Sequence, residues 1–291
     1  MIIAAQLPRA PLDQFIELLW FHEGLNRPHR LERVLPEGSV ELIINLRDQD
    51  RHVFDPLNYE PQQSYRRSWL SGPHSKFIVI DTARDASMIG VHFKPGGANA
   101  FFSMPLSELR NNVVALDVFW NGAAASLRDQ LLEAPTPADK FHILEAALLA
   151  RRRHREPTHP AVRYALDHFT RQPQFLSVGA ITAKIGLTPR RFIELFNDQV
   201  GMRPKVFCRV RRFQRALHEI QQRRNLRWAE LAPDCGYYDQ AHFISDFKEF
   251  CGLTPADYLN QAPEYPNFVP VRDGESDART RAHSQSYRKT D

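Results

Sequence analysis

The sequence predicts an α+β protein of two domains: an N-terminal β-barrel or sandwich-like domain with flanking helices, and an all-α C-terminal domain. One observation is a change of pattern, because short β-branched and aromatic runs dominate before residue 100 and helical spacing dominates after residue 160. Another is a repeat, since FIELFNDQVGMRP at 192–204 returns as FISDFKEFCGLTP at 243–255 with an offset of 51 residues. A repeated supersecondary unit predicts two helix-turn-helix units joined by a long helix.

Length and composition favour an ordinary globular protein. The chain has 291 residues, of which 43% are hydrophobic and 25% are charged, and this argues against disorder of the whole chain. No segment approaches the roughly 18 apolar residues of a membrane span, and the N-terminus lacks a basic start, so we expect a cytoplasmic protein without a membrane partner. The three cysteines, Cys208, Cys235 and Cys251, are odd in number and widely spaced, which favours neither a disulfide framework nor a metal knuckle.

The elements of the N-terminal domain follow from spacing and turn formers. Residues 11–21, PLDQFIELLWF, carry apolar residues at helical spacing after a proline suited to a first turn, so we expect an opening helix. Strands are expected in the runs VELIINL (40–46), SWLSG (68–72), KFIVID (76–81) and SMIGVHF (87–93). Helices are expected in PLSELR (105–110), LDVFWNGAAASLRDQLLE (116–133) and TPADKFHILEAALLARRR (136–153).

The glycine pair after the last of these strands has two interpretations. The segment HFKPGGANAFF (92–102) could bind an anion beside Lys94, because two glycines precede a helix start. We favour a strand that ends in a turn, with Gly96 or Gly97 supplying positive φ.

Charge and proline place the domain boundary at 151–160, RRRHREPTHP, which we interpret as a linker between residues 1–150 and residues 161–262. Residues 1–150 carry 14 Lys/Arg against 18 Asp/Glu, whereas residues 157–262 carry 15 against 10. A basic C-terminal domain favours a polyanion such as DNA. The linker arginines could contact DNA or the acidic N-terminal domain, which we call the front domain. The default interpretation is a linker surrounded by solvent. Residues 263–291 mix Pro, Ser, Asp and Arg without a period, so a disordered tail is predicted.

The C-terminal domain is expected to be helical throughout. A helix over 159–170 precedes the first unit, which combines LSVGAITAKIG (176–186) with a helix that starts at the N-cap Thr188. Residues 205–222 form the connecting helix, and the second unit combines RWAELAPDCG (227–236) with a helix from Asp239. The repeated residues are expected to build the fold, as buried phenylalanines and left-handed C-caps: Phe192, Phe196, Phe243, Phe247, Gly201 and Gly252.

This arrangement suits two adjacent major grooves of duplex DNA. The connecting helix spans roughly 27 Å at about 1.5 Å per residue, which places the two recognition helices about 34 Å apart with packing offsets. Arginine suits guanine, glutamate suits cytosine and glutamine suits adenine. The expected base contacts are Arg190, Arg191, Ile193, Glu194, Gln240, His242 and Ser245. The expected phosphate contacts are Thr188, Lys205, Arg209, Arg211 and Arg212.

The span from about residue 160 to residue 260 resembles the DNA-binding region of the AraC/XylS transcription regulators, because its end, CGYYDQAHFISDFKEFCGLTPADY, is similar to their signature. The resemblance implies seven helices, recognition helices in consecutive major grooves, and bacterial gene regulation. It places base-facing positions at Arg190, Ile193, Glu194, Gln240, His242 and Ser245. The chain departs from the pattern at Ser245, where relatives often have arginine, and at Pro233, where a helix former is usual.

The front domain resembles a β-rich domain of unknown function that precedes some of these regions, on the motifs LPEGSVELIINL and GVHFKPGGANAFFSMPLSEL. Analogy at the level of fold implies that such a domain binds a small effector or forms a homodimer. We therefore interpret the chain as a sequence-specific DNA-binding activator or repressor, whose partners could also include RNA polymerase, with no cofactor, no metal and no enzymatic activity expected.

Two alternatives stay open. The first is an enzyme or a metal-binding cupin-like domain tethered to DNA, although His52, His74 and His92 are too dispersed to resemble the cupin motif. The second is a non-specific architectural DNA binder.

Overall fold

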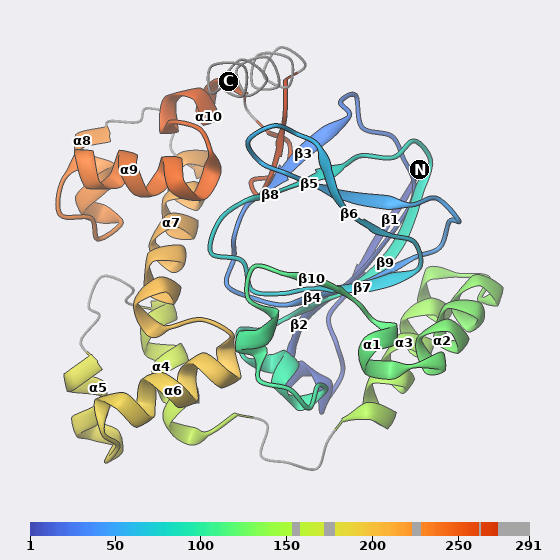
Figure 1. The fold of residues 1–291 in the computed structure, drawn as a ribbon, viewed down its shortest axis with the longest axis horizontal. Coiled ribbons are helices and arrows are strands. Elements are labelled where there is room, and N and C mark those ends of the chain that lie inside the picture. The colour runs from blue at the N-terminus through green and yellow to red at the C-terminus, as the bar shows by residue number, and fades with distance from the viewer. Residues whose placement is uncertain (153–157, 172–177, 223–227, 262, 273–291) are drawn as a thin grey trace, which may run out of the picture.

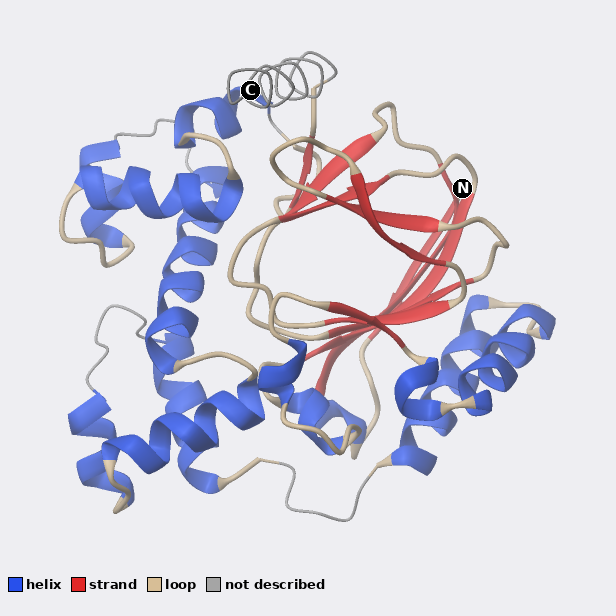
Figure 2. Cartoon of the chain, viewed as in Figure 1, coloured by secondary structure: helices blue, strands red, loops and turns tan. Residues whose placement is uncertain are grey.

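The computed structural model describes residues 1–152, 158–171, 178–222, 228–261 and 263–272. Two β-sheets face each other in the N-terminal part, and the helices of the C-terminal part lie along one side of them (Figures 1 and 2). The α+β class and the two-domain architecture predicted from the sequence are thereby confirmed.

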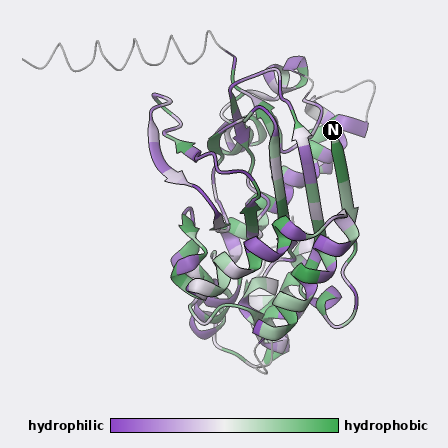
Figure 3. Ribbon diagram, turned by 90° about the vertical axis from the view of Figure 1, so that its right-hand side faces the viewer, coloured by the Kyte–Doolittle hydropathy of each residue, from purple (hydrophilic) through white to green (hydrophobic). Residues whose placement is uncertain are grey.

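The larger sheet has six antiparallel strands. Their spatial order is β1 (Ile2–Gln6), β2 (Ile16–Leu25), β9 (Ala86–Phe93), β4 (Glu41–Asn45), β7 (Ser68–Ser71) and β10 (Val113–Ala115). The edge strand β1 leaves Ile2 and Ile3 exposed, and it is coloured as hydrophobic beside the N label in Figure 3.

The smaller sheet has five strands, and its last member comes from the far end of the chain. The spatial order is β11 (Phe268–Pro270), β3 (Leu31–Val34), β8 (Ile78–Asp81), β5 (Arg51–Phe54) and β6 (Pro61–Tyr65). The four strands expected from the sequence are confirmed as β4, β7, β8 and β9. Of the other seven strands, β2 lies in the segment expected to be a helix. The remaining six were not predicted, because they are short or, like PQQSY in β6, carry no alternating apolar residues.

The two faces of the larger sheet have different environments. Its outer face packs against α1 (Asp117–Trp120), α2 (Gly122–Glu133) and α3 (Pro137–Arg151), and the three helices share one hydrophobic core with the sheet. Its inner face meets the smaller sheet, where Ile43 and Trp69 pack against Val53 and Tyr65. The sandwich therefore has one dry outer core and a mixed polar and apolar inner layer. The segment expected as the helix PLSELR is a 3-10 helix, Leu106–Leu109.

The opening helix predicted over 11–21 is wrong. Only Leu12–Gln14 form a short 3-10 helix, and the chain then enters β2, which pairs with β1 and β9. The register on β9 shifts between Ile16 and Leu18, so Ile16 and Leu19 are both buried. A bulge moves the inward face by one residue, and the resulting three-residue spacing imitates a helix.

Residues 92–97 follow the turn interpretation. Strand β9 ends at Phe93, and Gly96 adopts φ 77° as the N-cap of the 3-10 helix Gly97–Ala100. Lys94 donates its Nζ to the backbone oxygen of Asp13 at 2.6 Å. The lysine thus ties two segments of the domain together.

Seven helices follow in the described part of the C-terminal region, as the resemblance implies. They are α4 (Pro160–Arg171), α5 (Val178–Ile185), α6 (Pro189–Val200), α7 (Pro204–Gln222), α8 (Trp228–Asp234), α9 (Gln240–Cys251) and α10 (Pro255–Gln261). Pro233 is accommodated in the last turn of α8. Within the described residues no helix has the length and apolar character that a membrane crossing requires.

The predicted disordered tail is wrong for its first part. Residues 268–270 form β11, which pairs with β3, and Val269 is fully buried. The proline in this strand fits an edge position, where a missing backbone N–H costs no ladder bond. Residues 273–291 lie outside the described residues.

The start of the predicted linker packs on the front domain. The guanidinium of Arg151 lies 4.4 Å from the centre of the Trp120 ring, and that of Arg152 lies 5.3 Å from the Phe15 ring. Residues 153–157 lie outside the described part of the chain. The first two arginines of the run are therefore anchored by aromatic rings.

A buried histidine makes the stability of the front domain depend on pH. Burial lowers the pKa of His74 to about 4 from 6.5, and its Nδ1 atom has no hydrogen-bond partner. Between these two values the unfolded chain binds a proton that the folded chain does not, so stability falls as pH falls through this window. We expect His74→Gln to remove about 2 kcal/mol of the stability difference between about pH 7 and pH 5.

Urea unfolding of both proteins at the two pH values measures this difference. His22, whose pKa burial also lowers to about 4, leaves a remaining dependence of the same sign. An unchanged pH dependence in His74→Gln would contradict the neutral state assigned to this side chain.

Candidate nucleic-acid interface

Helix α6 begins and ends where its sequence dictates. The side chain of Thr188 caps it by accepting the backbone N–H of Arg191 at 3.3 Å, and Pro189 takes the first helical position. The helix ends at Gly201, whose φ of 86° is left-handed.

Helix α9 repeats this plan with a different cap. The carboxylate of Asp239 accepts the backbone N–H of His242 at 2.7 Å, and Gly252 ends the helix at φ 76°. Both predicted C-caps are therefore confirmed in the left-handed conformation.

The repeated phenylalanines form the buried faces of the two helices. Phe192 and Phe196 are fully buried in the first unit, and Phe243 and Phe247 are fully buried in the second. The centres of the two rings lie 5.7 Å apart in both pairs. This packing orients the remaining faces of α6 and α9 away from the core.

The first recognition helix presents two arginines and a glutamate at its N-terminal end. Arg190 and Arg191 are exposed, and Glu194 is 47% exposed. The Nε atom of Arg190 donates to Glu194 at 3.0 Å, which lines up the arginine along the helix. Ile193 is partly buried against the core of the unit, so it offers a smaller surface than its neighbours.

The second recognition helix presents smaller polar groups. Gln240 and Ser245 are exposed, whereas His242 is only partly exposed. The ring of His242 packs edge-on against Tyr237 at 5.5 Å, and its Nε2 atom lies 3.8 Å from Asp246. His242 is therefore held in place before any DNA arrives.

Two of the five residues expected to bind phosphate, Arg209 and Arg212, form hydrogen bonds to other elements of the protein. Arg209 donates to Asp246 at 2.7 Å and to Glu249 at 2.6 Å. Arg212 donates to the backbone oxygen of Gly236 at 3.1 Å. Arg211 is partly buried, and burial lowers its pKa while the charges of Glu37 and Glu17 raise it. Of the five, Lys205 and Thr188 remain exposed.

Asp246 organises this network, and the sequence reasoning missed it. Its side chain is 6% exposed and lies within 4.0 Å of Arg209, Arg212 and His242. The hydrogen bond from Arg209 to Asp246 is the main reason that the pKa of the arginine rises. A carboxylate one residue before the buried Phe247 was the available signal, since an acid next to a core position requires a cation.

The two recognition helices point the same way. The C-terminal cap of α6 lies against Pro73 and Leu106 of the front domain, and that of α9 lies against Phe77. The N-terminal ends, which carry the candidate base contacts, therefore point away from the two sheets (Figure 1). The N-terminal ends of α6 and α9 therefore lie on one face of the protein.

The inner layer of the sandwich holds a second group of polar side chains. The Nε1 atom of Trp20 donates to Glu41 at 2.8 Å, and the Nε2 atom of His92 lies 3.3 Å from Glu37. Burial raises the pKa of Glu41, although 29% of its side chain is reached by solvent. Gly90 permits this arrangement, because a Cβ atom there would lie 2.3 Å from the Trp20 indole.

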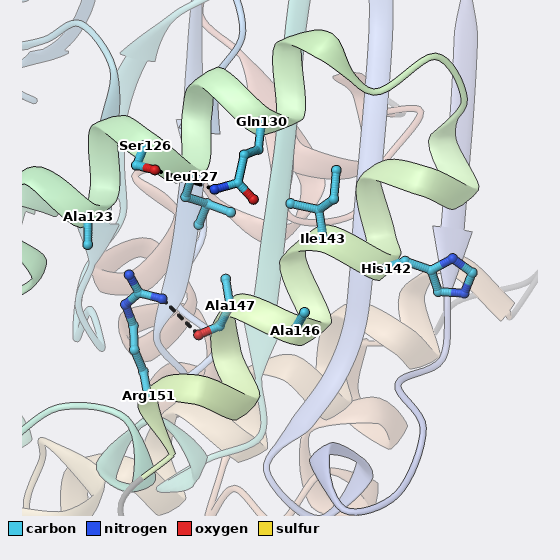
Figure 4. A pocket seen from close by; sticks show the side chains of 9 residues that line it. All are labelled: Ala123, Ser126, Leu127, Gln130, His142, Ile143, Ala146, Ala147 and Arg151. Atoms are coloured by element: carbon cyan, nitrogen blue, oxygen red, sulfur yellow. Dashed lines mark hydrogen bonds between the residues drawn. The ribbon is translucent and has the colours of Figure 1, made fainter.

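An open groove of about 400 Å³ lies on the outside of the front domain, between α2 and α3 (Figure 4). Its ionisable lining residues are His142 and Arg151, and Arg151 donates to the backbone oxygen of Ala147 at 2.9 Å. The two lie at opposite ends of the groove, so it assembles no acid–base pair. Within the described residues, no group of three or more His, Cys, Asp or Glu side chains could hold a metal ion.

Two known families match separate parts of the chain. Residues 5–115 match the family described as "Domain of unknown function (DUF6597)", and residues 181–261 match the family described as "Helix-turn-helix domain". The chain carries an AraC-type helix-turn-helix domain. The AraC-type domain contains α6 and α9, so the chain is a DNA-binding regulator of this type.

Several solved structures are similar to the chain at low sequence identity. The C-terminal domain of AraT, a response regulator from Geobacillus stearothermophilus, is 18% identical with a TM-score of 0.34, covering 40% of this chain and 90% of that one. ToxT from Vibrio cholerae is 7% identical with a TM-score of 0.43, covering 89% and 98%. A transcriptional regulator from Chromobacterium violaceum is 23% identical with a TM-score of 0.33, covering 36% and 94%. No curated protein matches the chain.

Proposed function

We propose that the chain is a sequence-specific, cytoplasmic transcription regulator, in which residues 161–262 read two adjacent major grooves and residues 1–150 control that reading. The observation that carries the proposal is the common direction of α6 and α9, whose capped N-terminal ends are exposed on the side away from the front domain. Helix α7 separates them, and its 19 residues correspond to about 28 Å at about 1.5 Å per residue. With packing offsets at its two ends, that length suits recognition helices that lie one duplex turn, about 34 Å, apart.

Residue roles follow from exposure and chemistry. Arg190 and Arg191 are proposed to read guanine, Gln240 adenine, and Glu194 cytosine when its arginine partners turn to DNA. His242 and Ser245 complete the second reading surface, and Ile193 offers its partly buried apolar side chain to a thymine methyl group. Lys205 and Thr188 are proposed to bind phosphate.

Selection from random duplex DNA tests this function. A sequence-specific regulator enriches one motif at physiological salt, where non-specific binding is weak. Recovery of unselected sequence would favour a non-specific architectural binder and would refute the proposal.

Two substitutions separate base reading from phosphate binding. Arg190→Ala is expected to weaken binding to the selected motif by about 1 to 3 kcal/mol and to relax specificity at one base pair. Lys205→Ala is expected to weaken binding to all sequences alike and to reduce the salt slope by about one unit. Titrations of both variants on matched and mismatched duplexes at several salt concentrations provide the measurement, and identical losses on the two duplexes would contradict the role of Arg190.

Control by the front domain is proposed to act through a small effector or through dimerisation. The inner layer supports the effector, because Glu41, His92 and Trp20 provide polar groups that solvent still reaches. A thermal-shift screen of metabolites against the full chain tests it, since a ligand that binds the folded state raises the melting temperature. An effector whose shift is the same in Glu41→Gln does not use this layer.

A further inference from the structure

The segment that follows the helix-turn-helix domain returns to the front domain. Phe268 pairs with Val34, and Pro270 pairs with Glu32, in an antiparallel ladder. On either side of the ladder, Leu35 donates its backbone N–H to Asn267 at 2.9 Å and Val271 donates to Leu31 at 2.9 Å. Residues 267–271 therefore complete the edge of the smaller sheet.

The same segment belongs to the core of the second helix-turn-helix unit. Val269 is fully buried in one cluster with Phe213, Phe247 and Phe250. Leu35, from the loop after β3, is buried in that cluster as well. Tyr258 of α10 donates its hydroxyl to the backbone oxygen of Pro266 at 2.9 Å. The second unit thus shares its core with the front domain and with this segment.

Gln214 on α7 joins all three parts. Its Nε2 atom donates to the backbone oxygen of Pro36 at 2.8 Å and to the side-chain oxygen of Asn267 at 2.9 Å. Asn267 in turn donates to the carboxylate of Glu37. A shift of the segment would break polar contacts with the front domain and with α7 together.

Within the residues that the structure describes, the first unit contributes no strand to the sheets of the front domain. Its core cluster contains residues of α4 to α7 and of the turns between them. It meets the front domain at its surface, where Gly201 lies against Pro73 and Asp198 accepts a hydrogen bond from Ser107 at 3.4 Å. The two units are therefore attached to the front domain in different ways.

We propose that residues 263–271 form a coupling strap, which ties the edge of β3 to the core of the second unit so that the order of α9 depends on the front domain. Because the reading ends of α6 and α9 point away from the sheets, the strap acts by supporting the second unit and leaves its DNA-facing side open. A change in the front domain that loosens β3 would then weaken the contacts of α9 with DNA bases and leave those of α6 unchanged.

Backbone hydrogen exchange of the full chain tests the strap without DNA. Val269→Asp puts a charge into the shared core, and Val269→Ala removes two methyl groups as a milder change. We expect amide exchange across α9 and α10 to accelerate by about tenfold or more in Val269→Asp and by a smaller factor in Val269→Ala, with α4 and α6 changed by less than about twofold. The control Glu264→Gln alters an exposed residue of the strap, whose carboxylate lies 3.3 Å from Arg27, and should leave exchange unchanged.

Unchanged exchange in α9 for both Val269 variants would overturn the strap, and so would equal acceleration in α6 and α9. A second arm, which rests on the proposed function, uses the DNA motif selected with the wild-type protein. Scrambling the half of the motif read by α9 should weaken binding by the wild type more than it weakens binding by Val269→Ala. Equal losses in both proteins would contradict the coupling, whereas failure to select any motif would refute the proposed function and leave the exchange result to decide the strap.

Discussion

Replacing Gly201 with alanine is expected to lower the free energy of unfolding by about 2 to 5 kcal/mol. The φ of 86° costs an L-residue about 1 to 2 kcal/mol. In addition, the new Cβ atom would lie 2.3 Å from Pro73 Cγ and 2.9 Å from the backbone oxygen of Leu106. Neither neighbour can turn away by a side-chain rotation, so the contact between α6 and the front domain must open, at an overpacking cost of about 1 to 3 kcal/mol.

Gly186 provides the matched control. Its φ is 67°, but a Cβ atom there would meet nothing within 4 Å, so Gly186→Ala carries the backbone cost alone. Urea unfolding followed by far-UV circular dichroism measures both variants. A loss in Gly201→Ala that equals the loss in Gly186→Ala would show that the contact with Pro73 does not constrain the fold.

The two glycines show how far local sequence determines this structure. A glycine after an apolar helical stripe predicts a left-handed C-cap, and Gly201 and Gly252 have that conformation. Their neighbours Pro73 and Phe77 could not be predicted, because those contacts join residues more than 100 positions apart in the chain and periodicity carries no information about such pairs. The left-handed caps follow from local sequence, whereas the contacts of these caps with the front domain follow from tertiary packing.

In the candidate interface too, local sequence predicts some features and tertiary packing determines the others. Helical spacing and the repeat identified the exposed positions Arg190, Gln240 and Ser245, since buried phenylalanines determine which side of a helix faces out. Helical spacing also predicted that Arg209 and Arg212 bind DNA phosphate. In the structure, both interact with Asp246 on another helix. A single helix face cannot reveal a partner that only the packed unit brings near.

Two of the errors about strands have a local cause. The bulge at the start of β2 imitated helical spacing, as described above. The strand β11 is short, contains Pro270 and lies in a segment rich in proline and polar residues, so its composition resembles a disordered tail. It is ordered because β3 and the second unit supply a partner on each side.

Asp246→Ala is expected to destabilise the second unit by about 3 to 5 kcal/mol. The carboxylate is 6% exposed, and its loss leaves Arg209 and Arg212 partly buried with one acidic partner fewer. Arg209 keeps Glu249 as a partner, whereas Arg212 keeps the backbone oxygen of Gly236 and loses its carboxylate. Removing one member of a buried ion pair costs more than the attraction that the pair itself contributes, because the remaining charge is less well compensated. His242 also loses the neighbour that lies 3.8 Å from its Nε2 atom, so reading by α9 should weaken together with stability.

Glu249→Ala is the control that distinguishes the effect of burying Asp246 from the effect of pairing a carboxylate with Arg209. Glu249 binds the same Nη2 atom of Arg209 at 2.6 Å, slightly closer than Asp246 at 2.7 Å, but its side chain is 41% exposed. Solvent screens such a pair, and the expected loss is at most about 1 kcal/mol. Urea unfolding of the two variants, together with hydrogen exchange across α9, gives the comparison. Because the bond lengths are so similar, a loss in Glu249→Ala as large as in Asp246→Ala would mean that the pairing of Arg209, and not the burial of Asp246, stabilises the contact between α7 and α9.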